Sequence, residues 1–408
     1  MLRVVGLGER VYSKLEKGGE TMREHALFNM SSGPVEVTPR TLRSLSRQIM
    51  YHYDPEFFDI FDDTVENLKK LFKTKNDVII MQGEALLGLE AAAFCTIEKG
   101  DKCLNLVSGV YGHLYAWYIN SFGGELVEVR TEYNKAIDPG EVEKTFKSHP
   151  DIKILSVVHC ETPSGTLNPI KEICQIAKKY GALTIVDAVS SMGGVAVETD
   201  QWGLDICVVG PQKCIASSPG VALISVSEEA WEKMKRKQNP VRYSYMSMLD
   251  MKEQWLIDKS KRRFPFTIFT SEVLALNEAL TQLMEEGPDK VIQRHKQAAK
   301  MCRAGVKGMG LELWADSEEI CATCATAIKT PEGMNDTKLR RHLYDRYRVL
   351  LSGGVGDLMG KLFRIGHMGK MAQPVYVAAA LAMVERSLHD LGYPVKLGSG
   401  VGAALEAV

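Results

Sequence analysis

Short, uninterrupted apolar runs alternate with longer amphipathic segments from Phe28 onward. Strands buried on both faces of a parallel sheet appear in sequence as continuous apolar runs, whereas covering helices carry a single apolar stripe. Residues 168–180 have such a stripe and are followed by Gly181, a residue that favours a helix end. The pattern predicts an α/β fold with a mostly parallel sheet. We expect its strands at residues 78–81, 102–107, 152–158, 183–186, 206–209 and 222–226.

The pattern changes after Ser271. Two long helical segments are followed by shorter strand candidates separated by helices, which predicts a smaller α+β domain at the C-terminus. The helices are expected at residues 272–284 and 289–309, and the strands at 320–328, 348–351 and 362–365. We assign residues 1–27 to an arm or short helix, residues 28–285 to a large domain and residues 286–408 to a small domain.

Composition excludes several classes of protein. The 408 residues are 45% hydrophobic, as in folded globular proteins, and the formal net charge of −1 offers no attraction to nucleic acid or to an anionic membrane. The cysteines do not form the pattern of a disulfide framework. The pair Cys321 and Cys324 lacks a second pair or a histidine at ligand spacing, so we expect no metal site.

The chain shows no targeting or membrane segment. Its first eight residues are too few for the apolar core of a signal peptide. The apolar stretch at residues 375–384 is shorter than the roughly 20 residues that a membrane-spanning helix requires. We expect a cytoplasmic protein.

Residues with chemical potential follow the predicted strands. Ligands of open α/β sheets bind beyond the carboxyl ends of the strands, and Asp187 and Lys213 each lie at or just after such an end. A buried lysine amine can form a Schiff base with an aldehyde, and a carboxylate can keep a pyridine nitrogen protonated. Taken singly, Lys213 could be a surface charge and Asp187 a helix cap. Together they point to a pyridoxal site.

Other residues near the strand ends have two interpretations each. Tyr111 could be a core aromatic or could stack on a planar ring, and Thr162 could satisfy a turn or bind a ring hydroxyl. Ser190 and the turn at Gly83 could cap a helix or bind phosphate. Arg364 lies in an apolar strand, where it could form an interdomain salt bridge or bind a substrate carboxylate.

Several segments together resemble a known family. These segments are residues 187–191, 210–213, 161–165 and 364–366, and they look like the class V, fold-type I pyridoxal phosphate aminotransferases. That family includes alanine–glyoxylate and serine–pyruvate aminotransferases. The resemblance implies a seven-stranded, mostly parallel sheet, a smaller C-terminal α+β domain, and a homodimer, or a pair of dimers, with the site at the subunit interface.

Within the family, the chain resembles the pyridoxamine–pyruvate transaminase group. Glu84 lies in a turn where other members have a small hydroxyl or imidazole residue, and its charge would repel a phosphate. Phe264 lies where phosphate-binding members carry a tyrosine from the neighbouring subunit. Three positions depart from this group: Val355 replaces a second substrate-binding arginine, Gln212 an asparagine, and Glu161 an aspartate.

The resemblance implies a transaminase that moves an amino group from pyridoxamine to pyruvate, giving pyridoxal and alanine, in vitamin B6 degradation. Lys213 and Asp187 are then catalytic, and Arg364 binds the substrate carboxylate. The alternative is an alanine– or serine–glyoxylate or –pyruvate aminotransferase with resident pyridoxal 5'-phosphate. A cysteine desulfurase is disfavoured because Gln212 precedes the lysine. The residues expected to bind the cofactor or pyridoxamine are Glu84, Tyr111, Thr162, Ser190, Gln212 and Thr267.

Overall fold

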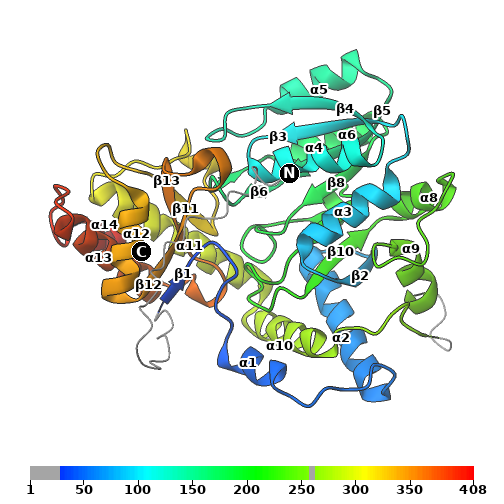
Figure 1. Cartoon of the computed structure of the whole chain (residues 1–408), viewed down its shortest axis with the longest axis horizontal. Helices are drawn as coiled ribbons and strands as arrows, with labels where there is room; N and C mark the ends of the chain where they lie inside the picture. Colours follow the sequence, from blue (N-terminus) through cyan, green and yellow to red (C-terminus); the bar gives the residue numbers. More distant parts are fainter. Residues whose placement is uncertain (1–27, 257–261) are drawn as a thin grey trace, which may run out of the picture.

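A seven-stranded sheet forms the centre of the larger lobe (Figure 1). The computed structural model describes residues 28–256 and 262–408, so the predicted N-terminal arm lies outside the described residues. Strand pairing is parallel except at β10, which runs antiparallel to both of its neighbours. The predicted mostly parallel seven-stranded sheet is confirmed. Its spatial order is β2 (Asp77–Gln82), β10 (Val221–Val226), β9 (Ile206–Val209), β8 (Leu183–Asp187), β5 (Ile152–Val158), β3 (Lys102–Val107) and β4 (Glu125–Arg130).

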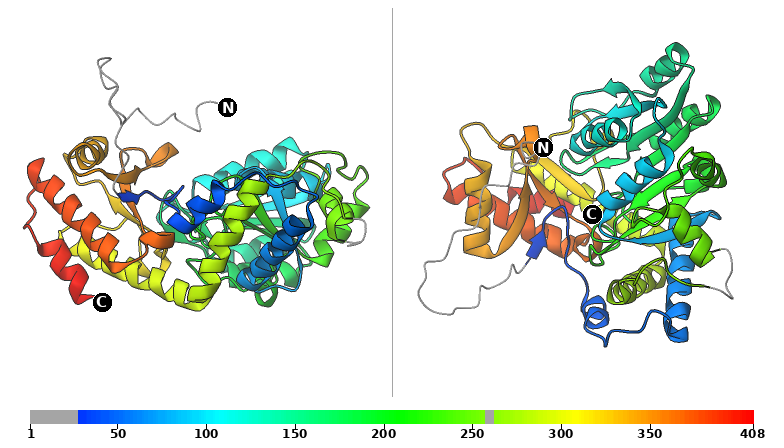
Figure 2. Two further views of the ribbon diagram at one scale, coloured as in Figure 1. Left: turned by 90° about the horizontal axis from the view of Figure 1, so that it is seen from below. Right: turned by 45° about the vertical axis from the view of Figure 1, so that its right-hand side comes forward.

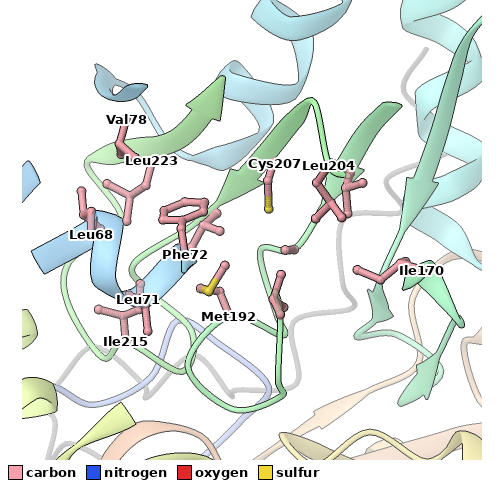
Figure 3. Close-up of a cluster of buried hydrophobic side chains, with 14 of the residues drawn as sticks. Leu68, Leu71, Phe72, Val78, Ile170, Met192, Leu204, Cys207, Ile215 and Leu223 are labelled. Carbon is pink, nitrogen blue, oxygen red and sulfur yellow. The ribbon is translucent and has the colours of Figure 1, made fainter. Parts of the chain in front are cut away.

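Both faces of this sheet are buried, which explains the continuous apolar runs. Side chains alternate along each strand, so Cys207 and Val209 join one core cluster while Ile206 and Val208 join the other. Figure 3 shows Leu68 and Phe72 near Val78 and Leu223 in the first cluster. That cluster is covered by α2 (Pro55–Phe72), α5 (Pro139–Ser148), α6 (Ile170–Lys179) and α10 (Thr270–Glu286). The opposite cluster is covered by α3 (Ala85–Thr96), α4 (Val110–Ser121), α8 (Glu228–Arg236) and α9 (Met248–Met251).

A four-stranded sheet and its helices form a separate lobe beside the large sheet (Figures 1 and 2). Its order is β1 (Phe28–Met30), β12 (Val349–Gly353), β13 (Leu362–Gly366) and β11 (Ala325–Lys329). Its helices are α11 (Pro288–Gly308), α12 (Asp336–Tyr347), α13 (Pro374–Asp390) and α14 (Ser399–Glu406). None of the helices in the described parts of the chain is long and apolar enough to cross a membrane.

The strand predicted at residues 320–328 is wrong at its start. The serine at position 317 caps a 3-10 helix, Glu318–Ile320, by accepting a hydrogen bond from the Glu319 amide. Arg303 pairs with the Glu318 carboxylate and holds this turn against α11. The strand therefore begins only at Ala325.

The first described residues belong to the four-stranded sheet, and the chain then crosses to the larger lobe. Strand β1 pairs in parallel with β12 of the four-stranded sheet, although its residues lie within the segment assigned to the large domain. The chain then passes through residues 31–38 to α1 (Pro39–Leu45), which packs against α10. This crossing brings residues 32–34 to the carboxyl ends of the large sheet, beside Lys213. The predicted domain limits themselves stay a prediction.

Candidate active site

A cavity of about 310 Å³ lies beyond the carboxyl ends of the parallel strands. This is the position that open α/β sheets use for ligands. Its walls come from the turns after β2, β3, β8 and β9 and from the crossing segment. Six of the predicted site residues line it: Glu84, Tyr111, Asp187, Ser190, Gln212 and Lys213.

Lys213 lies in the turn that follows β9. Its Nζ donates a hydrogen bond to the Ser32 carbonyl, at 2.6 Å. Burial lowers the pKa of Lys213, and the positive charge of Arg364 lowers it further. A larger fraction of the amine is therefore unprotonated at neutral pH than for a surface lysine, which is the form that attacks an aldehyde and accepts a proton.

Asp187 is the last residue of β8 and is 7% exposed. Its Oδ1 accepts a hydrogen bond from the Val189 amide, at 2.9 Å. Burial raises the pKa of Asp187 to about 7, while the Val189 amide and the Lys213 charge act in the opposite direction. Among the described residues, no cation forms an ion pair with this carboxylate. A protonated ring nitrogen would supply the missing positive charge.

Thr162 and Arg364 connect the two lobes next to the cavity. The Thr162 hydroxyl forms a hydrogen bond with the Ser190 hydroxyl, and its carbonyl accepts from Arg364 Nη1 at 2.9 Å. Arg364 Nε and Nη2 both donate to the Gly353 carbonyl, at 3.1 and 2.6 Å. Arg364 therefore does not form the interdomain salt bridge considered above. Within the described chain, its guanidinium contacts backbone carbonyls and no carboxylate.

Arg364 retains donors for an anion. A guanidinium carries five N–H groups, of which the three hydrogen bonds to Gly353 and Thr162 use three. Burial lowers the pKa of Arg364 to about 10, which still leaves it charged at neutral pH. A buried cation without a carboxylate partner favours an anionic ligand.

Glu84 is the N-cap residue of α3, but its side chain makes no capping hydrogen bond. The side chain faces the cavity, and burial raises the pKa of Glu84 while the Leu86 amide and Lys213 lower it. Nearby, the side-chain carbonyl of Gln212 is buried and has no hydrogen-bond partner in the described chain. Both groups could accept a hydrogen bond from a ligand.

Three other positions lie away from this cavity within the single chain. Thr267 is exposed and does not line the cavity. Phe264 is buried and stacks on Trp255, with ring centroids 4.3 Å apart, so its ring belongs to the aromatic core of the large lobe. Val355 is the N-cap residue of a 3-10 helix, Gly356–Leu358, after β12 and also does not line the cavity.

Sequence reasoning missed the residues of the crossing segment. Gly33 has a φ of +97°, and a Cβ there would lie 2.5 Å from Cδ of Lys213. Pro34 and Cys160 also line the cavity. A Gly-Pro pair signals a turn, but nothing local signals contact with a lysine 180 positions later.

This set of groups fits a pyridoxal group. It contains a buried amine of lowered pKa, a carboxylate without an ion-pair partner, an aromatic side chain and an amide oxygen without a partner. The cavity volume lies at the lower end of the range for small-molecule sites. Lys213 would hold the aldehyde carbon, and Asp187 would face the ring nitrogen.

Comparison with known proteins agrees with this interpretation. Residues 41–355 match the family Aminotransferase class-V. The chain is 42% identical to the pyridoxamine–pyruvate transaminase of Mesorhizobium japonicum, over 94% of this chain and 98% of that protein. It is 31% identical to the (S)-ureidoglycine–glyoxylate transaminase of Bacillus subtilis, over 92% of this chain and 94% of that protein.

Solved structures show the same likeness. The crystal structure of pyridoxamine–pyruvate aminotransferase from Mesorhizobium loti matches with a TM-score of 0.91 and 41% identity, over 95% of this chain and 98% of that chain. The family match includes both Asp187 and Lys213. The chain belongs to the class-V aminotransferase family and is an aminotransferase.

Proposed function

We propose that this aminotransferase transfers the amino group of pyridoxamine to pyruvate, giving pyridoxal and alanine, as a step of vitamin B6 degradation. The observation that carries the proposal is Glu84 in the cavity. The N-terminus of a helix such as α3 ordinarily favours phosphate, but a carboxylate at its N-cap repels one. The same carboxylate can accept a hydrogen bond from the hydroxymethyl group of unphosphorylated pyridoxamine. The similarity to pyridoxamine–pyruvate transaminase adds support.

Each site residue has a role in this proposal. As a free amine, Lys213 would move a proton from the aminomethyl carbon of pyridoxamine to the carbonyl carbon of pyruvate, and it would hold the aldehyde carbon of pyridoxal as an imine, with loss of water. Asp187 pairs with the protonated ring nitrogen, and Tyr111 stacks on the ring. Thr162 binds the ring hydroxyl, and Arg364 binds the pyruvate carboxylate through its two remaining N–H groups. When bound, the ring draws electron density from the carbon that loses its proton.

The remaining residues complete the site in a homodimer, which could pair into a tetramer. Ser190 and Gln212 bind ring substituents from within the chain. We propose that Thr267 acts in the cavity of a second copy, because it is exposed in its own chain. The surface near it carries exposed aromatic side chains, a feature of protein interfaces. These are Tyr51, Tyr53, Tyr245 and Phe269.

We also propose that the enzyme works in the cytoplasm and binds neither nucleic acid nor membrane. A homodimer predicts a mass in sedimentation of twice 45.3 kDa. A monomer that retains full activity would contradict the role given to Thr267.

The second candidate is a resident pyridoxal 5'-phosphate with alternating amino and keto acids, as in alanine– or serine–glyoxylate aminotransferases. Val355 favours it, because the resemblance to the pyridoxamine–pyruvate group implies a second substrate-binding arginine at this position. The 31% identity to a glyoxylate transaminase is consistent with it.

The test compares two reactions with the purified enzyme. One mixture holds pyridoxamine and pyruvate, and the other holds pyridoxal 5'-phosphate, alanine and glyoxylate; products are measured by chromatography. We expect pyridoxal and alanine in the first. Lys213→Ala should lose at least about 10²-fold in turnover in either mixture, since it removes both the covalent bond and the proton carrier. If the purified enzyme retains phosphorylated cofactor and does not turn over pyridoxamine, the second candidate is correct and the first is wrong.

Glu84→Gln tests the specificity directly. Removing the charge should improve binding of pyridoxal 5'-phosphate relative to pyridoxal by about tenfold, because one like-charge repulsion disappears. Glu90→Gln is the matched control, since Glu90 lies on the same helix α3 and does not line the cavity. An unchanged ratio in the Glu84 variant would remove the main support for an unphosphorylated substrate.

A further inference from the structure

The carboxylate of Glu161 is buried beside the cavity and has no role in the function proposed above. Glu161 ends the short strand β6 (Cys160–Glu161) and is 0% exposed. Its Oε1 accepts a hydrogen bond from the Gly112 amide at 2.7 Å, and its Oε2 accepts one from the Tyr111 amide at 3.2 Å. Tyr111, whose ring lines the cavity, is thus held through its backbone by a side chain 50 residues away.

Glu161 supplies the cap that helix α4 lacks. The helix begins after Gly109, whose position offers no side-chain cap. A Cβ on Gly109 would lie 2.3 Å from Cδ of Glu161, and a Cβ on Gly112 would lie 2.7 Å from the Leu106 carbonyl oxygen. The backbone of Gly109 is extended, so the requirement for glycine here is one of space. Gly109 therefore leaves room for the Glu161 carboxylate, and Gly112 lets the helix backbone approach strand β3 closely.

The charge environment of Glu161 suits this role. No cation among the described residues pairs with the carboxylate, so its charge is stabilised by the two amides and by the positive end of the α4 dipole. Burial raises the pKa of Glu161 to about 7, with a smaller contribution in the same direction from the Asp187 charge, whereas the amides of Gly112 and Tyr111 lower it. An acceptor in this position binds amide donors most strongly when it is ionised.

Thr162, the residue after Glu161, connects this part of the structure to the other predicted site residues. Thr162 contacts Ser190 through its hydroxyl and Arg364 through its carbonyl. The Glu161 carbonyl accepts from the Gly165 amide at 2.8 Å and closes the turn. Glu161 therefore contacts helix α4, while Thr162 contacts both the turn after β8 and the four-stranded sheet. These contacts meet at one corner of the cavity.

We propose that Glu161 is a positioning residue that holds Tyr111 in place over the pyridine ring by capping helix α4 from strand β6. The proposal rests on the proposed function in one respect: Tyr111 stacks on the ring. It holds equally for pyridoxal and for pyridoxal 5'-phosphate.

The experiment replaces the charge without changing the shape of the side chain. In Glu161→Gln, the amide group can serve only one of the two backbone donors and presents its own N–H groups to the other. We expect pyridoxal to bind about tenfold more weakly, as judged from an absorbance titration, because one charge-assisted hydrogen bond is lost. The circular dichroism of the bound ring should change with the position of Tyr111, and KM for pyruvate should stay within about twofold, since Arg364 is untouched.

The chain offers a matched control in Glu385. This residue is 3% exposed, and its carboxylate caps helix α14 from α13 by accepting from the amides of Gly398 and Gly400, at 2.6 and 2.7 Å. Glu385→Gln makes the same chemical change at the same kind of helix end, away from the cavity. We expect it to leave the pyridoxal affinity and the circular dichroism of the ring unchanged.

The measurements distinguish failure of the proposed function from failure of the positioning role. If the wild-type enzyme binds neither pyridoxal nor its phosphate, the proposed function fails. If the wild type binds and Glu161→Gln binds equally with an unchanged spectrum, only the positioning role fails. An equal loss in Glu385→Gln would also overturn it. If Glu161→Gln does not fold, Gly109→Ala provides the same comparison, because its Cβ displaces the Glu161 carboxylate without removing it. Wild-type pyridoxal affinity and an unchanged spectrum in Gly109→Ala would contradict the positioning role.

Discussion

At the scale of single residues, Arg364 shows how a cation is kept available in a buried site. A carboxylate partner would neutralise the guanidinium, whereas carbonyls orient it and leave its charge in place. Gly353 and Thr162 provide these carbonyls from the two lobes. A keto acid carboxylate would then complete the set of donors.

Arg364→Lys should raise KM for pyruvate by about 10- to 100-fold with a smaller effect on kcat. A lysine ammonium cannot reach both carbonyls and still present two parallel donors to a carboxylate. Steady-state kinetics at varied pyruvate concentration measures this effect. Arg294→Lys is the control, because Arg294 also donates to two backbone carbonyls, those of Gly369 and Ala372, but its charge is already paired with the Glu286 carboxylate. Equal effects in the two variants would argue against contact between Arg364 and substrate.

At the scale of elements, the crossing from β1 to α1 places backbone atoms against the lysine that is proposed to be catalytic. Strand β1 belongs to the four-stranded sheet, yet the residues after it touch Lys213. The carbonyl of Ser32 accepts the lysine amine, and Gly33 packs against the lysine side chain. The position of the lysine amine therefore depends on how the two lobes are joined.

Gly33→Ala should remove most of the turnover. The new Cβ would lie 2.8 Å from the Lys213 amine and would also require a left-handed backbone, which costs about 1–2 kcal/mol for an alanine. Gly181→Ala imposes the same kind of backbone strain, since its φ is +71° and no atom lies near the new Cβ. Both variants should lose free energy of unfolding in urea through this strain, Gly33→Ala by more because of its contact with Lys213, and only Gly181→Ala should keep its activity. Full activity in Gly33→Ala would show that the contact with the lysine is dispensable.

The elements themselves were largely predictable. Continuous apolar runs located the six strands expected in the large sheet because each run spans a buried strand. The reversed direction of β10 could not be read from its sequence, since a run buried on both faces has the same composition in either direction. The start of β11 was misjudged because a serine cap and an ion pair of Arg303 with Glu318 hold residues 318–320 in a 3-10 turn.

At the scale of the whole molecule, buried titratable groups make the stability of the cofactor-free enzyme depend on pH. Burial raises the pKa of Asp187 from 3.8 to about 7, so the folded state binds this proton more tightly than the unfolded state. The contribution of Asp187 to stability therefore decreases as pH rises from about 4 to about 7. Three buried histidines act in the opposite sense, because burial lowers the pKa of each from 6.5 to about 4; these are His159, His295 and His367.

Comparing the wild type with Asp187→Asn separates the pH dependence due to the Asp187 carboxylate from that due to the histidines. The free energy of unfolding of the wild type minus that of the variant should fall with rising pH over this window, by up to about 1.4 kcal/mol per pH unit. Urea unfolding of cofactor-free protein at several pH values measures the difference. The variant should also lose about 10²-fold or more in kcat with substrate present, since the ring nitrogen loses its counter-charge. A pH-independent difference would mean that Asp187 titrates in its ordinary range.

The sequence by itself determined where six of the seven strands of the large sheet lie along the chain, and it predicted the two groups proposed to carry the chemistry. Asp187 and Lys213 follow apolar runs directly, and parallel strands bring their carboxyl ends to one edge, so local pattern was enough. Only the tertiary structure decided what holds these groups. Lys213 meets Ser32 across 181 positions, and Arg364 meets Thr162 across 202. Such contacts form where the chain crosses between lobes, and hydrophobic periodicity is a local signal that cannot report them.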